Sequence, residues 1–119
     1  MNKRETGSIH ETEVIGYLEG KGYRIIARNV SNRFGEIDII CISPENELVF
    51  AEVKYRKDHD RFDPLEAVDA RKIRKICRAS AFYIGGHRDL TDMQVRYDVI
   101  GVYDKGDVRH IVNAFEYVG

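Results

Sequence analysis

At residues 35–56 the chain reads GEIDIICISPENELVFAEVKYR. Two runs rich in Ile, Val, Phe and Tyr, Glu36 to Ile42 and Leu48 to Tyr55, lie on either side of the polar sequence SPENE. Short runs of β-branched and aromatic residues around such a turn predict a β-hairpin. The hairpin is the clearest structural signal in the sequence, and the other elements are placed around it.

The length of the turn sets the register of this hairpin. With residues 43–47 as a five-residue loop, the opposed pairs are Ile42–Leu48, Ile40–Phe50, Asp38–Glu52 and Glu36–Lys54. Side chains alternate along a strand, so all of these residues share one face of the hairpin. That face is apolar near the turn and ionic away from it.

The ionic part of the face contains two carboxylates, Asp38 and Glu52, directly opposite each other. Like charges in this position destabilise a sheet, so something should compensate them. A divalent cation such as Mg²⁺ does so naturally, because it binds oxygen ligands and keeps most of its waters. Lys54 points the same way as Glu52, close enough to orient a water. Such a set of groups is suited to hydrolysis of a phosphodiester bond.

A plainer interpretation of the same residues stays open. Strands that alternate apolar and charged residues usually expose one face to water. In that case Glu36 with Lys54, and Arg56 nearby, form ordinary cross-strand ion pairs. The hairpin alone does not decide between ion pairs and a metal site.

The N-terminal region predicts a helix from about Ser8 to Lys21. Ser8 has the chemistry of an N-cap, and Glu11, three residues later, completes a capping box. A stripe at helical spacing contains Glu11, Val14, Ile15 and Leu18. Glu11 therefore lies on the side expected to face the sheet, where it either serves the helix cap or points at a cation above the strands.

A second helical pattern runs from Pro64 to about Ile84, where two glycines follow. Its apolar side consists of Leu65, Val68, Ile76, Ala79 and Tyr83. Lys72 falls within this apolar arc, so its ammonium must either reach solvent or meet an anion. The neighbouring arc is a basic ridge of Arg71, Arg74, Lys75 and Arg78. A solvated helix face explains such a ridge, but beside two carboxylates it is also what a nucleic-acid backbone requires.

Three more strands complete the pattern. They are predicted at Tyr23 to Val30, Gln94 to Tyr103 and Val108 to Tyr117, the last two around the turn sequence DKGD. The predicted order is α-β-β-β-α-β-β, which indicates an α/β or α+β protein whose mixed sheet has a helix against each face. A length of 119 residues is suited to one domain.

The composition excludes several classes of protein. Nineteen Lys and Arg nearly cancel twenty Asp and Glu, so an anionic partner must bind a local patch rather than a uniformly basic surface. The N-terminus lacks the apolar core of a signal peptide, and no stretch approaches the ~20 apolar residues of a membrane span. Cys41 and Cys77 stand singly in apolar segments, which is typical of reduced core thiols. We expect a cytoplasmic protein that has no membrane partner.

Two motifs, GEIDII at residues 35–40 and FAEVKYR at residues 50–56, resemble those of the PD-(D/E)xK nuclease superfamily. The chain is more closely similar to the YraN-like family of small bacterial proteins, predicted endonucleases related to the archaeal Holliday-junction resolvases. The similarity covers nearly the whole chain and includes Glu11, Lys72 and the sequence RYDV at residues 96–99.

The resemblance implies a restriction-endonuclease-like fold, in which helices flank a mixed central sheet of about five strands, and a single nuclease-like domain over residues 1–119. It implies that Asp38 and Glu52 bind Mg²⁺ or Mn²⁺. Glu11 would be a further acidic member of the site, and Lys54 the catalytic lysine. Lys72 matches a lysine on the family's second long helix, for which we expect a contact to phosphate.

The expected function is therefore metal-dependent hydrolysis of phosphodiester bonds in nucleic acid, with Lys72, the basic ridge and Arg56 as contacts to the backbone. Kinship with the resolvases further implies DNA rather than RNA, including branched or flapped forms, and a homodimer that cuts two strands. Two alternatives stay open. One is a non-catalytic nucleic-acid-binding or partner-docking domain that retains the nuclease fold. The other is a structural protein in which Asp38 and Glu52 face water.

Overall fold

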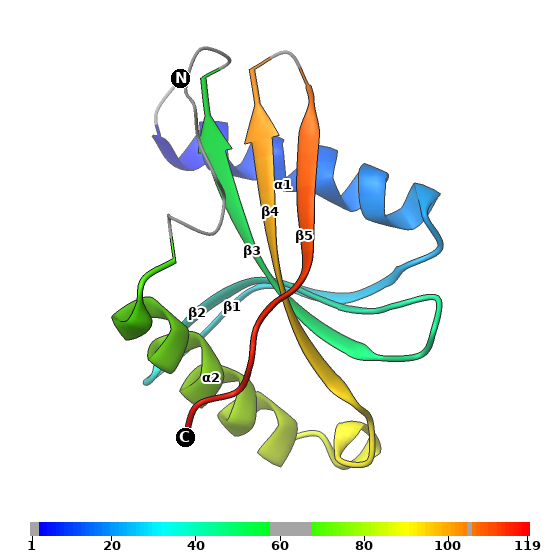
Figure 1. Ribbon diagram of the computed structural model, residues 1–119, viewed down its shortest axis with the longest axis vertical. Coiled ribbons are helices and arrows are strands. Elements are labelled where there is room, and N and C mark those ends of the chain that lie inside the picture. Colours follow the sequence, from blue (N-terminus) through cyan, green and yellow to red (C-terminus); the bar gives the residue numbers. More distant parts are fainter. Residues whose placement is uncertain (1–2, 58–67, 105) are drawn as a thin grey trace.

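The computed structural model describes residues 3–57, 68–104 and 106–119 of the chain (Figure 1). Its elements are the helices α1 (Lys3–Gly20) and α2 (Ala70–Gly85), the short 3-10 helix η2 (Arg88–Leu90), and the strands β1 (Arg24–Asn32), β2 (Gly35–Ile42), β3 (Leu48–Arg56), β4 (Val95–Tyr103) and β5 (Val108–Phe115). The predicted order α-β-β-β-α-β-β is confirmed, and η2 is an addition between α2 and β4.

The strands form a five-stranded sheet in the order β1-β2-β3-β4-β5. Neighbouring strands are antiparallel except β3 and β4, which form a parallel ladder from Leu48–Val95 to Arg56–Tyr103. Parallel strands need a crossover connection, and α2 lies within the segment that joins these two. The sheet is therefore mixed, as predicted, and β3 is its central strand.

Side chains that alternate along the central strands build two apolar clusters, one beneath each helix. Phe50 of β3 and Ile76 of α2 belong to the first cluster. The adjacent Val49 and Leu18 of α1 belong to the second. Figure 1 shows the sheet between α1 and α2. The predicted helix against each face is confirmed.

The predicted register of the first hairpin is correct near the turn and ends before the charged residues. The β2–β3 ladder consists of Ile42–Leu48, Cys41–Val49, Ile40–Phe50 and Ile39–Ala51. The predicted pairs Asp38–Glu52 and Glu36–Lys54 are not part of this ladder. Glu36 is exposed, and Lys54 contacts Glu52, so the ion pair between Glu36 and Lys54 is not formed either.

Asp38 is the residue at which the two strands separate. If the ladder continued, Val53 would oppose Ile37. Instead the N–H of Val53 donates to Oδ2 of Asp38 at 2.8 Å, and β2 stays paired with β1. The regular alternation of faces is also interrupted here, because Ile37 joins the α2-side cluster whereas Ile39 joins the α1-side cluster. A side chain has replaced the backbone of the neighbouring strand as hydrogen-bond acceptor.

Both helices begin at residues other than those predicted. α1 begins at Lys3, so Ser8 lies inside the helix and is not its N-cap. Lys3, Arg4 and Glu5 are good helix formers, and the helix continues from them through Ser8. Before α2, Asp69 has an extended conformation and its carboxylate accepts the N–H of Lys72 at 2.8 Å, so Asp69, not Pro64, precedes the helix. Pro64 and Leu65 lie outside the described residues.

The two cysteines are free and buried, as expected. Burial raises the pKa of the Cys41 thiol to about 12, so this thiol stays protonated and unreactive. Within the described ranges, neither helix combines the length and the apolar content that a bilayer crossing requires.

Candidate active site

The carboxylates and lysines singled out in the sequence come from four elements. Asp38 lies on β2, Glu52 and Lys54 lie on β3, and Lys72 lies in the first turn of α2. α1 contributes Glu11, whose charge acts on Asp38. The separation of β2 from β3 thus lets residues from both helices act on the same carboxylates.

Glu52 is buried, with 6% of its surface exposed, and contacts two lysines. Its Oε1 lies 3.2 Å from Nζ of Lys54 and 3.1 Å from Nζ of Lys72. Lys72, which was expected either to reach solvent or to meet an anion, therefore meets one. A buried carboxylate is costly unless it is paired, so these two ammonium groups stabilise Glu52 in place.

Lys72 carries a persistent positive charge beside this carboxylate. Burial lowers the pKa of Lys72, but the attraction of Glu52 and the hydrogen bond to it outweigh burial, and the pKa is raised above its ordinary value. The side chain is still 42% exposed. Lys72 is therefore protonated at neutral pH and can be approached by an anion from solvent.

The charge of Asp38, unlike that of Lys72, is disfavoured by its surroundings. Burial, and then the negative charge of Glu52, raise its pKa to about 7, with a further contribution from Glu11. The hydrogen bond from Val53 and the charge of Lys54 reduce this shift without cancelling it. A carboxyl group in this state binds a proton near neutral pH or accepts a cation in its place.

Glu11 has an unused hydrogen-bond acceptor. Its side chain is 14% exposed, and its Oε2 lies 3.7 Å from Nη2 of Arg28 but has no hydrogen-bond partner. Since α1 begins well before it, Glu11 is not needed as a cap and faces the sheet, as its place in the stripe predicted. Crowded carboxylates with unused oxygen lone pairs are the donor set that suits a hard divalent cation.

In the structure, Asp38, Glu52 and Glu11 are not arranged as a metal site. Among the residues that the structure describes, no group of three His, Cys, Asp or Glu side chains is close enough to hold an ion. In this arrangement Oε1 of Glu52 is in contact with Lys54 and Lys72.

The basic ridge is exposed along α2. It consists of Arg71, Arg74, Lys75 and Arg78. Arg71, Lys72, Lys75 and Asp69 line a hollow of about 340 Å³ at the start of the helix, so the ridge continues to the lysine that contacts Glu52. Arg56 lies at the end of β3 and donates from Nη1 to the carbonyl oxygen of Tyr55 at 2.7 Å.

A second charged cluster, which the sequence did not predict, lies between β4, β5 and α1. Asp98 is fully buried and accepts hydrogen bonds from Nε and Nη2 of Arg96 at 2.9 and 2.8 Å, from Nε2 of His110 at 2.7 Å, and from the N–H of Asn113 at 2.9 Å. Burial alone would raise the pKa of Asp98, but these hydrogen bonds outweigh burial and the pKa is lowered. Arg96 and Asp98 stand two residues apart on one face of an apolar strand, and this spacing is a signal that could have revealed the pair.

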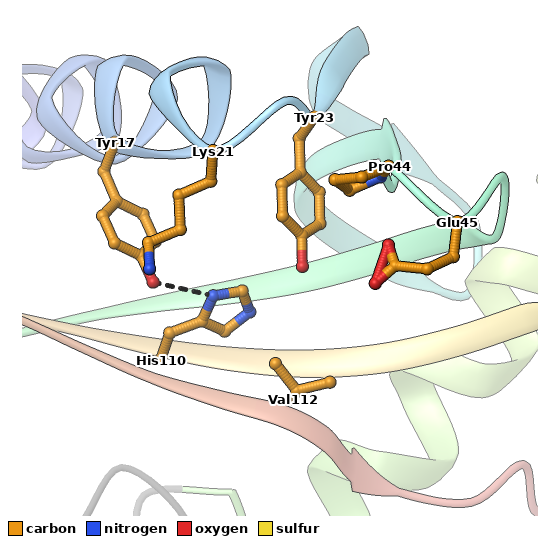
Figure 2. A pocket seen from close by; sticks show the side chains of 7 residues that line it. All are labelled: Tyr17, Lys21, Tyr23, Pro44, Glu45, His110 and Val112. Atoms are coloured by element: carbon orange, nitrogen blue, oxygen red, sulfur yellow. Dashed lines mark hydrogen bonds between the residues drawn. The ribbon is translucent and has the colours of Figure 1, made fainter.

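His110, which donates to Asp98, lines a hollow of about 380 Å³ together with Tyr17 and Tyr23 (Figure 2). At its edge, the hydroxyl of Tyr17 is hydrogen-bonded to Nδ1 of His110 at 3.1 Å, and Arg96 donates to the hydroxyl of Tyr23 at 2.7 Å. These bonds connect α1 and the segment before β1 to β4 and β5. Asp98 is therefore linked to α1 through His110 and Tyr17, and Arg96 links Asp98 to Tyr23 before β1.

The raised pKa of Asp38 predicts a loss of stability as the pH rises. The folded protein holds this proton to about pH 7 whereas the unfolded chain releases it near pH 4, so the free energy of unfolding falls between these values. Because Asp38 is partly exposed, we expect a net loss of about 1 to 2 kcal/mol. Asp38→Asn, which keeps an acceptor for Val53, should remove this loss and be more stable than wild type at pH 8. Urea denaturation at pH 4 and pH 8 in EDTA measures it.

The exposed Asp92→Asn serves as the control for this prediction, since it removes a carboxylate outside the site. A variant Asp38→Asn that is less stable than wild type at pH 8 would mean that the carboxylate is well compensated, contrary to the raised pKa.

The comparisons with known proteins place the chain in a family. A sequence model of the uncharacterised protein family UPF0102 matches residues 10–102. A UPF0102 protein of Lachnoclostridium phytofermentans is 40% identical over 119 residues, which cover 100% of this chain and 99% of that protein. A UPF0102 protein of Marinobacter nauticus is 46% identical over 99 residues, which cover 83% of this chain and 79% of that protein.

Among solved structures, a repair endonuclease from Pyrococcus abyssi is 13% identical to this chain, with a TM-score of 0.41. The match covers 89% of this chain and 41% of the endonuclease, so this chain spans less than half of that protein. At this level of likeness, a function has to follow from the residues of this chain.

Proposed function

This chain belongs to the uncharacterised protein family UPF0102, the YraN family, and we propose that it is a metal-dependent nuclease that hydrolyses phosphodiester bonds of nucleic acid. The observation that carries the proposal is the meeting of Asp38, Glu52 and Lys54 at the point where β2 and β3 separate. The PD-(D/E)xK-like motifs of the sequence supply exactly the residues that meet there.

Asp38, Glu52 and Glu11 are the residues that would hold the ion, Mg²⁺ or Mn²⁺. The raised pKa of Asp38 supports a cation at this place, because burial first, and then the negative charge of Glu52, leave this carboxylate poorly compensated. The unbonded Oε2 of Glu11 supports it as well. The bound ion would supply Lewis-acid stabilisation of the phosphate oxygens.

Lys54 is the residue that would act on the attacking water and the phosphate. An ammonium group has three N–H donors, and one contact to Glu52 leaves donors for a water and for a phosphate oxygen. The side chain of Lys54 is 21% exposed, so its ammonium is accessible from the surface. A fixed cation beside the scissile bond stabilises the charge that develops on phosphate in the transition state.

Lys72 and the basic ridge would hold the backbone of the substrate. The hollow at the start of α2 presents Arg71, Lys72 and Lys75 together, and phosphate contacts of this kind supply most of the sequence-independent affinity for nucleic acid. We take DNA, including branched and flapped forms, as the substrate class because of the resemblance to the resolvases.

A cleavage assay tests the proposal. We expect purified wild type to cut labelled linear, flapped or four-way DNA in the presence of Mn²⁺ or Mg²⁺ and not in EDTA. Lys54→Ala should lower the rate by about 10²- to 10³-fold, because it removes a charge aimed at the phosphate. The control Lys21→Ala, an exposed lysine at the far end of α1, should leave the rate unchanged.

Two outcomes would contradict the proposal. Equal cleavage by wild type and Lys54→Ala would point to a contaminating enzyme. Binding of DNA by wild type without cleavage of any substrate would favour the non-catalytic nucleic-acid-binding domain.

A further inference from the structure

One aromatic residue interrupts the charged surface of α2. Arg71, Lys75, Arg78 and Phe82 follow one another at steps of four, three and four residues, the spacing of a single helical stripe. All four are exposed, and Phe82 has 53% of its surface exposed. The basic ridge therefore ends in an aromatic ring that solvent can reach.

The turn between β1 and β2 adds a second ring and a guanidinium to Phe82. The rings of Phe34 and Phe82 have their centroids 5.7 Å apart at an interplanar angle of 58°. Cζ of Arg33 lies 4.7 Å from the centroid of Phe34 and 5.9 Å from that of Phe82. We call Arg33, Phe34 and Phe82 the aromatic platform.

Contacts with α2 fix this turn in place. Nδ2 of Asn32 donates to the carbonyl oxygen of Ala79 at 3.2 Å, and Oδ1 of Asn32 accepts the N–H of Phe34 at 3.0 Å. Gly35 has φ of 157°, and a Cβ at this position would lie 3.6 Å from Cβ of Lys75, so the turn packs closely on the helix. The aromatic platform is therefore preformed.

The rings of Phe34 and Phe82 differ in how far they are buried. Phe34 is partly buried and packs against the α2-side apolar cluster. Phe82 is more than half exposed, so core packing accounts for little of its ring. An exposed ring beside Arg33 and at the end of four basic residues has the chemistry that binds an unpaired base, whose flat face stacks on the ring while its phosphates contact the cations.

We propose that the aromatic platform stacks an unpaired nucleobase, and that the substrate of this protein has a single-stranded segment that lies along α2. The proposal rests on the nuclease function and specifies its substrate class. Ten residues separate Lys72, next to Glu52, from Phe82, which is about 15 Å along the helix axis. Both faces of a base inside a duplex are covered by the neighbouring base pairs, so the platform distinguishes a single strand or a flap from the interior of a duplex.

Binding measurements in a cleavage-disabled protein test this inference. In the Glu52→Gln background, fluorescence anisotropy would compare a labelled single strand with a blunt duplex of the same length. Phe82→Ala should weaken single-strand binding at least about 5-fold, the lower limit for one stacked base, and change duplex binding less than twofold. Arg78→Ala should weaken single-strand binding and duplex binding by a similar factor, and it should reduce the salt dependence of each. The exposed Val112→Ala on β5 is the matched control.

A direct reporter uses the absence of tryptophan from the sequence. Phe82→Trp introduces a single tryptophan that keeps a stacking surface, so we expect single-strand binding to be retained and the tryptophan fluorescence to be quenched on binding. Val112→Trp places the same fluorophore beside the hollow near α1 (Figure 2) and should not be quenched.

The outcomes separate this inference from the proposed function. Equal weakening of single-strand and duplex binding by Phe82→Ala, or no weakening of either, would overturn the aromatic platform while leaving the nuclease proposal intact. A wild-type protein that binds neither form at low salt would overturn both.

Discussion

We expect Glu52→Gln to lower the rate of DNA cleavage by at least about 10³-fold, the largest effect of any single substitution in the site. Glu52 is the carboxylate that both lysines contact, and the change leaves its shape while removing its charge. The variant loses one proposed ligand of the ion, and it loses the anion that Lys54 contacts. The rate of cleavage in the presence of Mn²⁺, compared with wild type, measures the effect.

The same variant should still bind DNA at least as tightly as wild type, because removing a negative charge reduces repulsion of the phosphates. Glu19→Gln, an exposed change on α1, is the matched control and should cut at the wild-type rate. Retention of cleavage in Glu52→Gln would exclude Glu52 from the catalytic machinery. The reaction would then need another centre.

The second large effect concerns stability rather than cleavage. We expect Asp98→Ala to lower the free energy of unfolding by about 3 to 5 kcal/mol. The substitution leaves the buried guanidinium of Arg96 without its main partner, and it also removes the acceptor of His110 and of the Asn113 N–H. Urea denaturation at pH 7 measures the loss.

The free energy of unfolding of Asp98→Asn should lie between those of wild type and Asp98→Ala, because an amide keeps a hydrogen-bond acceptor but not the charge. The exposed Asp107→Ala, in the turn before β5, controls for the loss of a carboxylate. A loss below about 1 kcal/mol in Asp98→Ala would mean that the cluster is not a structural centre of the fold.

The hairpin shows how far sequence reasoning reaches. A five-residue loop and strict alternation leave one register that keeps the apolar residues together, and the pairs Ile42–Leu48 and Ile40–Phe50 follow from it. The register fails at Asp38 because a side-chain carboxylate takes the N–H of Val53. A pattern of apolar residues contains no information about that replacement.

The helices show a different limit. The stripe of α1 correctly places Val14 and Leu18 in the core, because burial follows helical spacing. The predicted first residues of both helices were wrong. Several residues near each helix start have the chemistry of an N-cap, and only the backbone conformation determines which of them precedes the helix. Asp69, which caps α2, is as good an N-cap by type as Ser8, which lies inside α1.

The sequence singled out the residues of the candidate site but did not predict their contacts. Asp38, Glu52 and Lys54 follow from their spacing, but the contact of Lys72 with Glu52 depends on where α2 crosses the sheet. The Asp98 cluster was missed for the same reason. Tyr17 and His110 are 93 residues apart, and only the packing of α1 against β4 and β5 brings them together.

β3 has two neighbouring strands as far as Ala51 and, within the described part of the chain, one neighbour from Glu52 to Arg56. With an apolar β-branched residue at position 38, the β2–β3 ladder would extend beyond Ile39–Ala51. This extension would close the gap in which the acidic groups lie. Selection for thermal robustness alone and selection for activity would therefore favour different residues at this one position. The proposed cleavage reaction thus depends on the shortness of the β2–β3 ladder.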